Sequence, residues 1–220
     1  MTLIRLIPLC FLVFVSTASA AAPLPRVLIL GDSIYNEPAK FAANQLKGRV
    51  EVVWKYAGDT SSVLARIEEL LGDGKWDLIH FSCGLSDLHY KDPSTKSIRA
   101  MSKQAGGIRV TTPEQYEQNL RALGKRFQAT SAKLVWASIT PIGDVPTGIY
   151  DSGSEIEYNK IAAKVMAELR VPINDIHTLI SEQRDMKRPA SGDPYNFDRN
   201  LVRAPIIAAI RRKLGLPVEE

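Results

Sequence analysis

The sequence is poor in the residues that build metal centres and disulfide frameworks. It contains only two cysteines and three histidines among 220 residues. Cys10 lies in an apolar N-terminal segment, so a chain cleaved after that segment keeps Cys83 alone and cannot form an internal disulfide. No group of His, Cys and carboxylate residues has the spacing of metal ligands. The sequence therefore predicts no metal and no other cofactor, and a core stabilised by the burial of apolar side chains.

A strong charge of one sign is also absent. The formal net charge is +4, and the basic residues are spread along the chain instead of forming an arm with interleaved aromatic residues. We therefore expect no nucleic acid partner. Internal repeats, low-complexity tracts and linkers are missing as well. With 45% hydrophobic residues, the chain predicts one domain over residues 21–220, and we expect a monomer.

The one long apolar run lies at the N-terminus. Arg5 precedes the apolar residues 6–15, and small residues follow at positions 18–20. This order is typical of a secretory signal peptide cleaved after Ala20, because the run is short for a membrane anchor; an uncleaved anchor is the alternative. We predict that residues 1–20 are a signal peptide. The mature chain would then be exported, to the periplasm or the medium, without stable membrane insertion.

Short apolar runs alternate with helical patterns along the rest of the chain. Runs typical of strands buried on both faces lie at residues 27–30, 50–54, 78–81, 134–137 and, more briefly, 171–173. Helical periodicity covers residues 63–71, follows Thr112, follows a capping box at residues 154–157, and ends before Gly215. This alternation predicts a three-layer α/β/α sandwich around a mostly parallel five-stranded sheet.

Polar clusters follow the predicted strands: residues 31–33, 58–60, 84–87 and 140–141. Ligands of such folds bind beyond the carboxyl ends of the strands, so these clusters predict a ligand crevice. A long polar insertion, residues 91–112, directly follows the third strand, and loops of that length beside a crevice are more often functional or mobile than simple connections.

Ser33 has the position of a nucleophile, because a serine between a strand and a helix can direct its hydroxyl into the crevice and its N–H toward an oxyanion. The alternative is that Ser33 or Asn36 is only the N-cap of the next helix. A nucleophilic serine also needs a base. His80 lies inside a strand and His177 at a helix start, whereas His89 follows the third strand and either faces the crevice or decorates the surface.

Four segments, in order, resemble the sequence blocks of the SGNH/GDSL hydrolases, an esterase superfamily with a flavodoxin-like fold. They read GDSIY, YAGDTSSVLARIEEL, WDLIHFSCGLSDL and SGDPYNF. The resemblance implies that Ser33 is the nucleophile and a backbone oxyanion donor. It further implies that Gly58 supplies a second oxyanion N–H, that Ser86 stands at the position of the third donor, and that Asp193 and Asn196 stand at the positions of the catalytic aspartate and histidine.

Two positions depart from the family pattern. Ser86 replaces an asparagine, although a hydroxyl can still donate one hydrogen bond. Asn196 replaces the histidine, and an amide cannot accept a proton near neutral pH. Three explanations stay open: the alignment at Asp193 is shifted and another base such as His89 serves, the activity is weak, or the protein binds an acylated glycan or similar ligand without turnover. The first function we expect is hydrolysis of acetyl or short acyl esters of carbohydrates.

Overall fold

The structure is a computed structural model, and it describes residues 22–95, 98–143, 147–183 and 197–217. A parallel five-stranded sheet in the order β2-β1-β3-β6-β7 forms its centre. The strands are β1 (Arg26–Gly31), β2 (Glu51–Tyr56), β3 (Leu78–Phe81), β6 (Lys133–Ala137) and β7 (Ile173–Asn174). The predicted sheet is therefore confirmed, with all five strands at or near the expected ranges.

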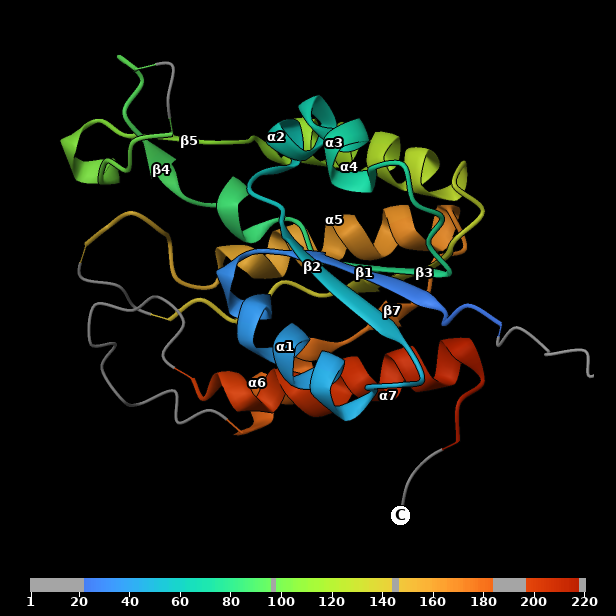
Figure 1. Cartoon of the computed structure of the whole chain (residues 1–220). Coiled ribbons are helices and arrows are strands. Elements are labelled where there is room, and N and C mark those ends of the chain that lie inside the picture. The colour runs from blue at the N-terminus through green and yellow to red at the C-terminus, as the bar shows by residue number, and fades with distance from the viewer. Residues whose placement is uncertain (1–21, 96–97, 144–146, 184–196, 218–220) are drawn as a thin grey trace, which may run out of the picture.

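Helices cover both faces of the sheet (Figure 1). One layer contains α1 (Asn36–Gln45), α6 (Ile176–Gln183) and α7 (Arg203–Leu214). The opposite layer contains α2 (Thr60–Ala65), α3 (Ile67–Leu71), α4 (Pro113–Gln128) and α5 (Ser154–Glu168). The strands β1 and β3 are buried almost throughout, because helices pack on both of their faces. The predicted three-layer α/β/α sandwich is confirmed.

Two helix starts differ from the sequence prediction. The helical pattern of residues 63–71 is broken at Arg66, whose φ of −114° and ψ of 19° end α2 and start α3. At α5, Gly153 rather than Ser154 is the N-cap, with a left-handed φ of 73°, so the predicted capping box is wrong. The helix starts one residue earlier, and Glu155 turns inward and is buried.

The polar insertion after β3 forms a small hairpin. Its strands are β4 (Tyr90–Lys91) and β5 (Ile108–Arg109), and the 3-10 turn η3 (Lys103–Ala105) lies between them. Asp151 ties the hairpin to the loop before α5: Arg109 Nη2 lies 2.8 Å and Lys103 Nζ 3.2 Å from its carboxylate. The Tyr90 hydroxyl donates to the same carboxylate at 2.5 Å. The insertion is thus anchored beside the ends of the strands.

Candidate active site

Ser33 lies in a one-turn 3-10 helix, η1 (Ser33–Tyr35), that directly follows β1. The N-cap of η1 is Asp32, whose carboxylate accepts the Ile34 N–H at 2.8 Å. The next helix, α1, has Tyr35 at its N-cap position and no side-chain cap. The alternative interpretation, in which Ser33 or Asn36 is an N-cap, is therefore wrong. The side chain that caps the turn is that of Asp32, and α1 has no side-chain cap.

The Ser33 side chain is exposed. None of the residues that the structure describes forms a hydrogen bond with its hydroxyl. Burial raises the pKa of the neighbouring Asp32 carboxyl to about 6, while the Ile34 N–H and the charge of Arg199 act to lower it. Arg199 belongs to η4 (Arg199–Val202), so the segment before α7 reaches the turn that carries Ser33.

The strand register brings the second and third sequence blocks to the same level as Ser33. Gly31 pairs with Tyr56 on β2, so Ser33 and Gly58 each lie two residues beyond this pair. Leu30 pairs with Phe81 on β3, so Ser33 and Gly84 each lie three residues beyond that pair. Parallel strands thus deliver all three loops to one edge of the sheet.

Both loops need glycine where they leave their strands. Gly58 has a φ of +79° and Gly84 a φ of +146°, values that other residues rarely adopt. A Cβ on Gly84 would lie 2.3 Å from the Ile139 side chain. After Gly84 the chain forms η2 (Leu85–Asp87), which carries Ser86. Glycine therefore sets the path of each loop that carries a candidate oxyanion donor.

A buried carboxylate links the two loops. Asp87 accepts the Thr60 N–H at 3.0 and 3.1 Å and the Thr60 hydroxyl hydrogen at 2.6 Å. Asn119 on α4 donates to the Thr60 and Ser61 hydroxyls at 3.0 and 2.9 Å. Burial raises the pKa of Asp87 to about 7, although the bonds from Thr60 act to lower it. Asp87 is thus a positioning residue that holds the loop of Gly58 against the loop of Ser86.

A cavity of about 530 Å³ lies over these loops. Its lining contains Gly58 and Ser86, the two candidate oxyanion positions, together with His89. The remaining lining residues are Tyr56, Asp59, Ser62, Arg66 and Ile98. Ile98 belongs to the long insertion, which therefore forms part of the cavity wall. The described residues thus form a cavity at this edge of the sheet from two of the predicted polar clusters, 58–60 and 84–87, whereas Ser33 is not among its lining residues.

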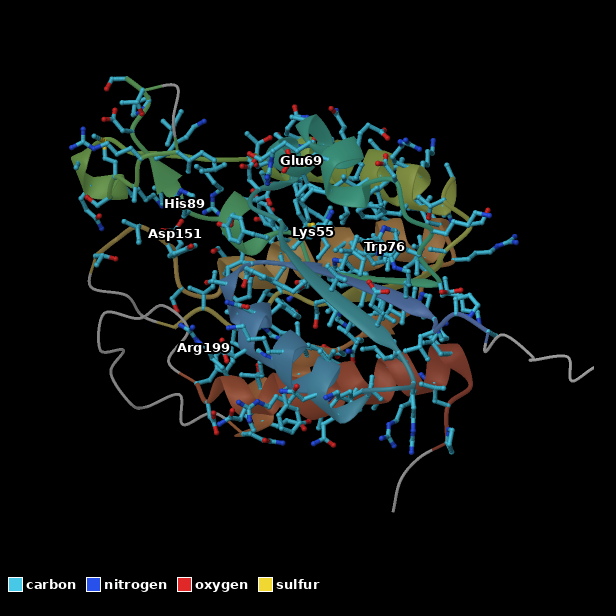
Figure 2. The ribbon with its side chains drawn as sticks, viewed as in Figure 1. Lys55, Glu69, Trp76, His89, Asp151 and Arg199 are labelled. Atoms are coloured by element: carbon cyan, nitrogen blue, oxygen red, sulfur yellow. The ribbon has the colours of Figure 1, made fainter. Side chains whose placement is uncertain are left out.

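His89 is half buried in the wall of this cavity instead of decorating the surface. Its ring packs against Tyr150, with centroids 6.1 Å apart, and it lies at the end of the molecule where the strands finish (Figure 2). Burial lowers the pKa of His89, although a hydrogen bond with the Ser86 backbone and the charge of Asp59 act to raise it. A neutral imidazole, which can accept a proton, is therefore favoured at this position.

The other two histidines lie away from this cavity, one inside a strand and one at the start of a helix. His80 is buried in β3 with its Nε2 3.2 Å from the Asn174 amide nitrogen, and burial lowers its pKa to about 4. His177 is the second residue of α6, and its Nε2 lies 3.3 Å from Glu155 on α5. Both positions agree with the sequence prediction. The predicted residues Asp193 and Asn196 lie outside the described residues.

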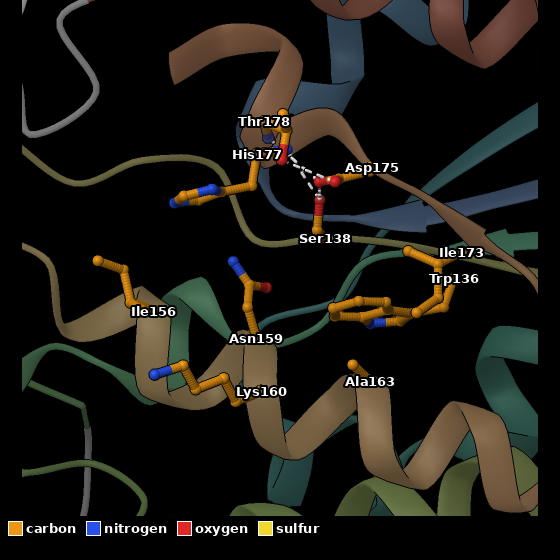
Figure 3. Close-up of a pocket in the computed structure, with 10 residues that line it drawn as sticks. All are labelled: Trp136, Ser138, Ile156, Asn159, Lys160, Ala163, Ile173, Asp175, His177 and Thr178. Carbon is orange, nitrogen blue, oxygen red and sulfur yellow. Dashed lines mark hydrogen bonds between the residues drawn. The ribbon is translucent and has the colours of Figure 1, made fainter. Parts of the chain in front are cut away.

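A second cavity, of about 280 Å³, lies between α5 and the end of β7 (Figure 3). It also contains a serine, an aspartate and a histidine: Ser138, Asp175 and His177. The Ser138 hydroxyl donates to Asp175 at 3.1 Å and accepts the backbone N–H of His177 at 2.8 Å. The imidazole of His177 points away from Ser138 (Figure 3). The hydrogen bonds of these three residues therefore stabilise the start of α6. The residues do not have the geometry of a catalytic triad.

Sequence reasoning missed Asp32 as the cap, Asp87 as the link between the loops, and the cavity wall formed by Tyr56 and Arg66. Only the position of Asp32 before a serine turn carried a signal for its role. Within the described residues there is no group of three or more His, Cys, Asp or Glu residues that could hold a metal ion. The described helices also include none that is long and apolar enough to cross a membrane.

No protein-family model and no curated protein sequence matches the chain. Solved structures do match it. A lipase/acylhydrolase from Enterococcus faecalis is 15% identical with a TM-score of 0.68, over 90% of this chain and 100% of that one. A putative GDSL-like lipase from Parabacteroides merdae is 17% identical with a TM-score of 0.66, over 88% and 96%. An acetylxylan esterase from Geobacillus stearothermophilus is 16% identical with a TM-score of 0.63, over 88% and 95%. The chain therefore has the fold of the SGNH/GDSL hydrolases.

Proposed function

We propose that this protein is an exported serine esterase that removes acetyl or short acyl groups from carbohydrates, with Ser33 as its nucleophile. The observation that carries the proposal is the exposed Ser33 hydroxyl at the end of β1, without a partner among the described residues, beside the loops of Gly58 and Ser86. A serine used only to shape a turn would spend its hydroxyl on the backbone. The fold shared with the esterases named above supports the same chemistry.

In the proposed reaction, the Ser33 Oγ attacks the ester carbonyl carbon, and the carbonyl oxygen becomes an oxyanion. The N–H groups of Ser33 and Gly58 and the hydroxyl of Ser86 are the proposed donors to that oxygen. Collapse breaks the bond to the alcohol oxygen, and the alcohol leaves with the proton that the base took from Ser33. Water then attacks the acyl-enzyme and releases a carboxylic acid.

The proposed base is His89, because burial favours its neutral form and it lines the cavity that contains Gly58 and Ser86. Asn196, at the position of the family's histidine, cannot take the proton, and Asp193 would have no imidazole to orient there. We therefore expect turnover below that of an enzyme with a complete triad. A general base typically contributes about 10²- to 10⁴-fold to the rate.

The proposal of export rests on the apolar N-terminal segment. Expression of the full chain in a bacterium with a periplasm, followed by N-terminal sequencing, tests it. Processing after Ala20 and recovery outside the cytoplasm are the expected results. An intact N-terminus on protein that stays in the cytoplasm would contradict export.

The esterase activity is tested with p-nitrophenyl acetate and purified residues 21–220. We expect release of nitrophenol above that of Ser33→Ala, while Ser138→Ala, a matched serine at the end of β6, keeps the wild-type rate. Equal rates for the wild type and Ser33→Ala would contradict the proposal. In that case a protein that binds an acylated glycan without turnover becomes the better account.

A further inference from the structure

We propose that Tyr56 and Arg66 form the subsite that holds the sugar half of the ester, next to the oxyanion donors. The inference rests on the proposed function, and it adds which residues set the preference for a carbohydrate alcohol. The cavity of about 530 Å³ is within the range of about 300–1,000 Å³ typical of small-molecule sites. Since Gly58 and Ser86 line it, a ligand in this cavity lies beside two of the proposed oxyanion donors.

The chemistry of the cavity wall distinguishes the two halves of an ester. Ile98 is the one aliphatic side chain that the described residues contribute, whereas Asp59, Ser62, Arg66, Ser86 and His89 are polar. An acyl chain gains free energy from burial against apolar surface and loses it beside polar groups that must shed water. A sugar offers hydroxyl groups for such a wall. The cavity therefore fits the alcohol side of a carbohydrate ester better than a long acyl chain.

Tyr56 provides the aromatic surface that sugar recognition needs. It is the last residue of the edge strand β2 and remains 49% exposed, although large aromatic side chains are usually buried. Its ring is braced from one side by Trp54, with the centroids 6.5 Å apart and the planes at 67°. The ring also adjoins the oxyanion loop, because a Cβ placed on Gly58 would lie 3.7 Å from Tyr56 Cε1. The apolar C–H face of a sugar ring can stack on such a platform while its hydroxyls stay in the polar part of the cavity.

Arg66 supplies hydrogen-bond donors on a fixed side chain. Its Nη2 donates to the Ala57 carbonyl at 3.1 Å, and its Nη1 lies 3.8 Å from the Glu69 carboxylate. These contacts hold the guanidinium over the loop of Gly58, where it lines the cavity. A guanidinium has five N–H donors, so others can bind sugar hydroxyls. Asp59 is less available, because both of its oxygens already accept hydrogen bonds from Ser62.

The test compares two acetyl esters that differ only in the alcohol: acetylated xylo-oligosaccharide and ethyl acetate, each followed by titration of the released acid. For Tyr56→Ala we expect a KM for the oligosaccharide raised about 10-fold, the upper range for loss of one aromatic contact. The same variant should keep the wild-type kcat/KM for ethyl acetate, which is too small to reach the platform. Tyr56→Phe retains the ring and should stay within about twofold of the wild type. Ile173→Ala, which removes an exposed side chain from the opposite edge strand, is the matched control.

A Tyr56→Ala variant with an unchanged KM for the oligosaccharide would overturn the subsite. So would an equal loss on both esters, since Tyr56 would then act only through the loop of Gly58. Failure of the proposed function gives a different pattern, in which the wild type and Ser33→Ala hydrolyse neither ester. Binding then decides: calorimetric titration of the acetylated oligosaccharide into Ser33→Ala should show affinity that Tyr56→Ala lowers about 10-fold. Equal affinity of Ser33→Ala with and without the Tyr56 ring would again overturn the proposed subsite.

Discussion

Two serines of this protein lie at comparable places in the sheet but differ in the hydrogen bonds that their hydroxyl groups make. Ser33 follows β1 and Ser138 follows β6, both at the carboxyl edge of the parallel strands. The Ser138 hydroxyl makes two hydrogen bonds, donating to Asp175 and accepting from the His177 N–H. The Ser33 hydroxyl is exposed and has no partner among the described residues, because Asp32 has taken the capping role.

The difference shows that residue type and strand position do not make a nucleophile. Ser138 has an aspartate and a histidine close by, yet its hydrogen bonds hold the start of α6. The Ser33 hydroxyl has no partner among the described residues and lies at the same edge as the loops of Gly58 and Ser86, yet the position that the sequence resemblance assigns to the histidine holds Asn196. The number of hydrogen bonds that the local backbone demands from each hydroxyl separates the structural serine from the candidate catalytic one.

The largest expected effect is an increase in kcat when a histidine is placed at position 196, where the resemblance predicts the base that would serve Ser33. In a His89→Ala background, which removes the proposed base, Asn196→His should raise kcat for p-nitrophenyl acetate by about 10²- to 10⁴-fold, the usual contribution of a general base. Asn200→His, which places an imidazole on the nearby turn η4, serves as the control and should leave kcat unchanged. An unaltered kcat in Asn196→His would show that position 196 does not reach the Ser33 hydroxyl.

The third oxyanion donor should have the next largest effect. Ser86→Ala removes a proposed hydrogen bond to the developing oxyanion, so kcat should fall by up to about 10²-fold with KM nearly constant. Ser138→Ala should stay within about twofold of the wild type in the same assay. A matching loss in both variants would indicate general destabilisation instead of a role for Ser86.

For stability the order should be the reverse of that for activity: substitution of Ser138 should have the larger effect and substitution of Ser33 the smaller. Ser138→Ala leaves the His177 N–H without its acceptor and removes one of the two hydrogen bonds to Asp175 Oδ1, so the free energy of unfolding should fall by about 1–2 kcal/mol. Ser33→Ala removes an exposed hydroxyl and should change it by less than about 0.5 kcal/mol. Urea denaturation of the two variants measures both values. A larger loss in Ser33→Ala than in Ser138→Ala would mean that Ser33 is a structural residue.

The two regions should also respond to pH in opposite directions. Burial raises the pKa of Asp87 to about 7 from an ordinary value of 3.8, so its protonated form favours folding and its contribution is lost as the pH rises through that window. For Asp175, partial burial acts to raise the pKa, but hydrogen bonds from Thr178 and Ser138 outweigh it and lower the pKa. Its contribution is therefore present above pH 3.8 and lost as the pH falls.

Denaturation between pH 3 and 8 tests this contrast. Relative to the wild type, Asp87→Asn should weaken the decline in stability from pH 4 to 7, while Asp175→Asn should weaken the decline toward pH 3. Parallel curves for the wild type and Asp87→Asn would show that this carboxyl titrates at its ordinary pKa in the folded protein.

The sheet could be predicted from sequence because its strands read as apolar runs, most clearly the buried strands β1, β3 and β6. The predicted strand at residues 78–81 has the same bounds as β3, Leu78–Phe81. The break at Arg66 could not be predicted, since Val63 and Leu70 keep one apolar face across it. At α5 a Ser-x-x-Glu pattern predicted a cap, but the left-handed Gly153 provides it.

The candidate site was predictable in outline only. Ser33, Gly58 and Ser86 could be placed at one edge because parallel strands align their carboxyl ends. Whether the Ser33 hydroxyl is needed to cap the turn depends on the local geometry, in which the Asp32 carboxylate accepts the Ile34 N–H. The same is true of His89, whose place in the cavity wall depends on packing against Tyr150.

The most direct test of the central claim is mass spectrometry after incubation with a phosphonofluoridate ester, which forms a stable adduct on a nucleophilic serine. Our account predicts one adduct per chain, on the peptide that contains Ser33, lost in Ser33→Ala and retained in Ser138→Ala. An adduct on Ser138, or a Ser33 peptide that stays unmodified while an established serine esterase is labelled in the same tube, would contradict it.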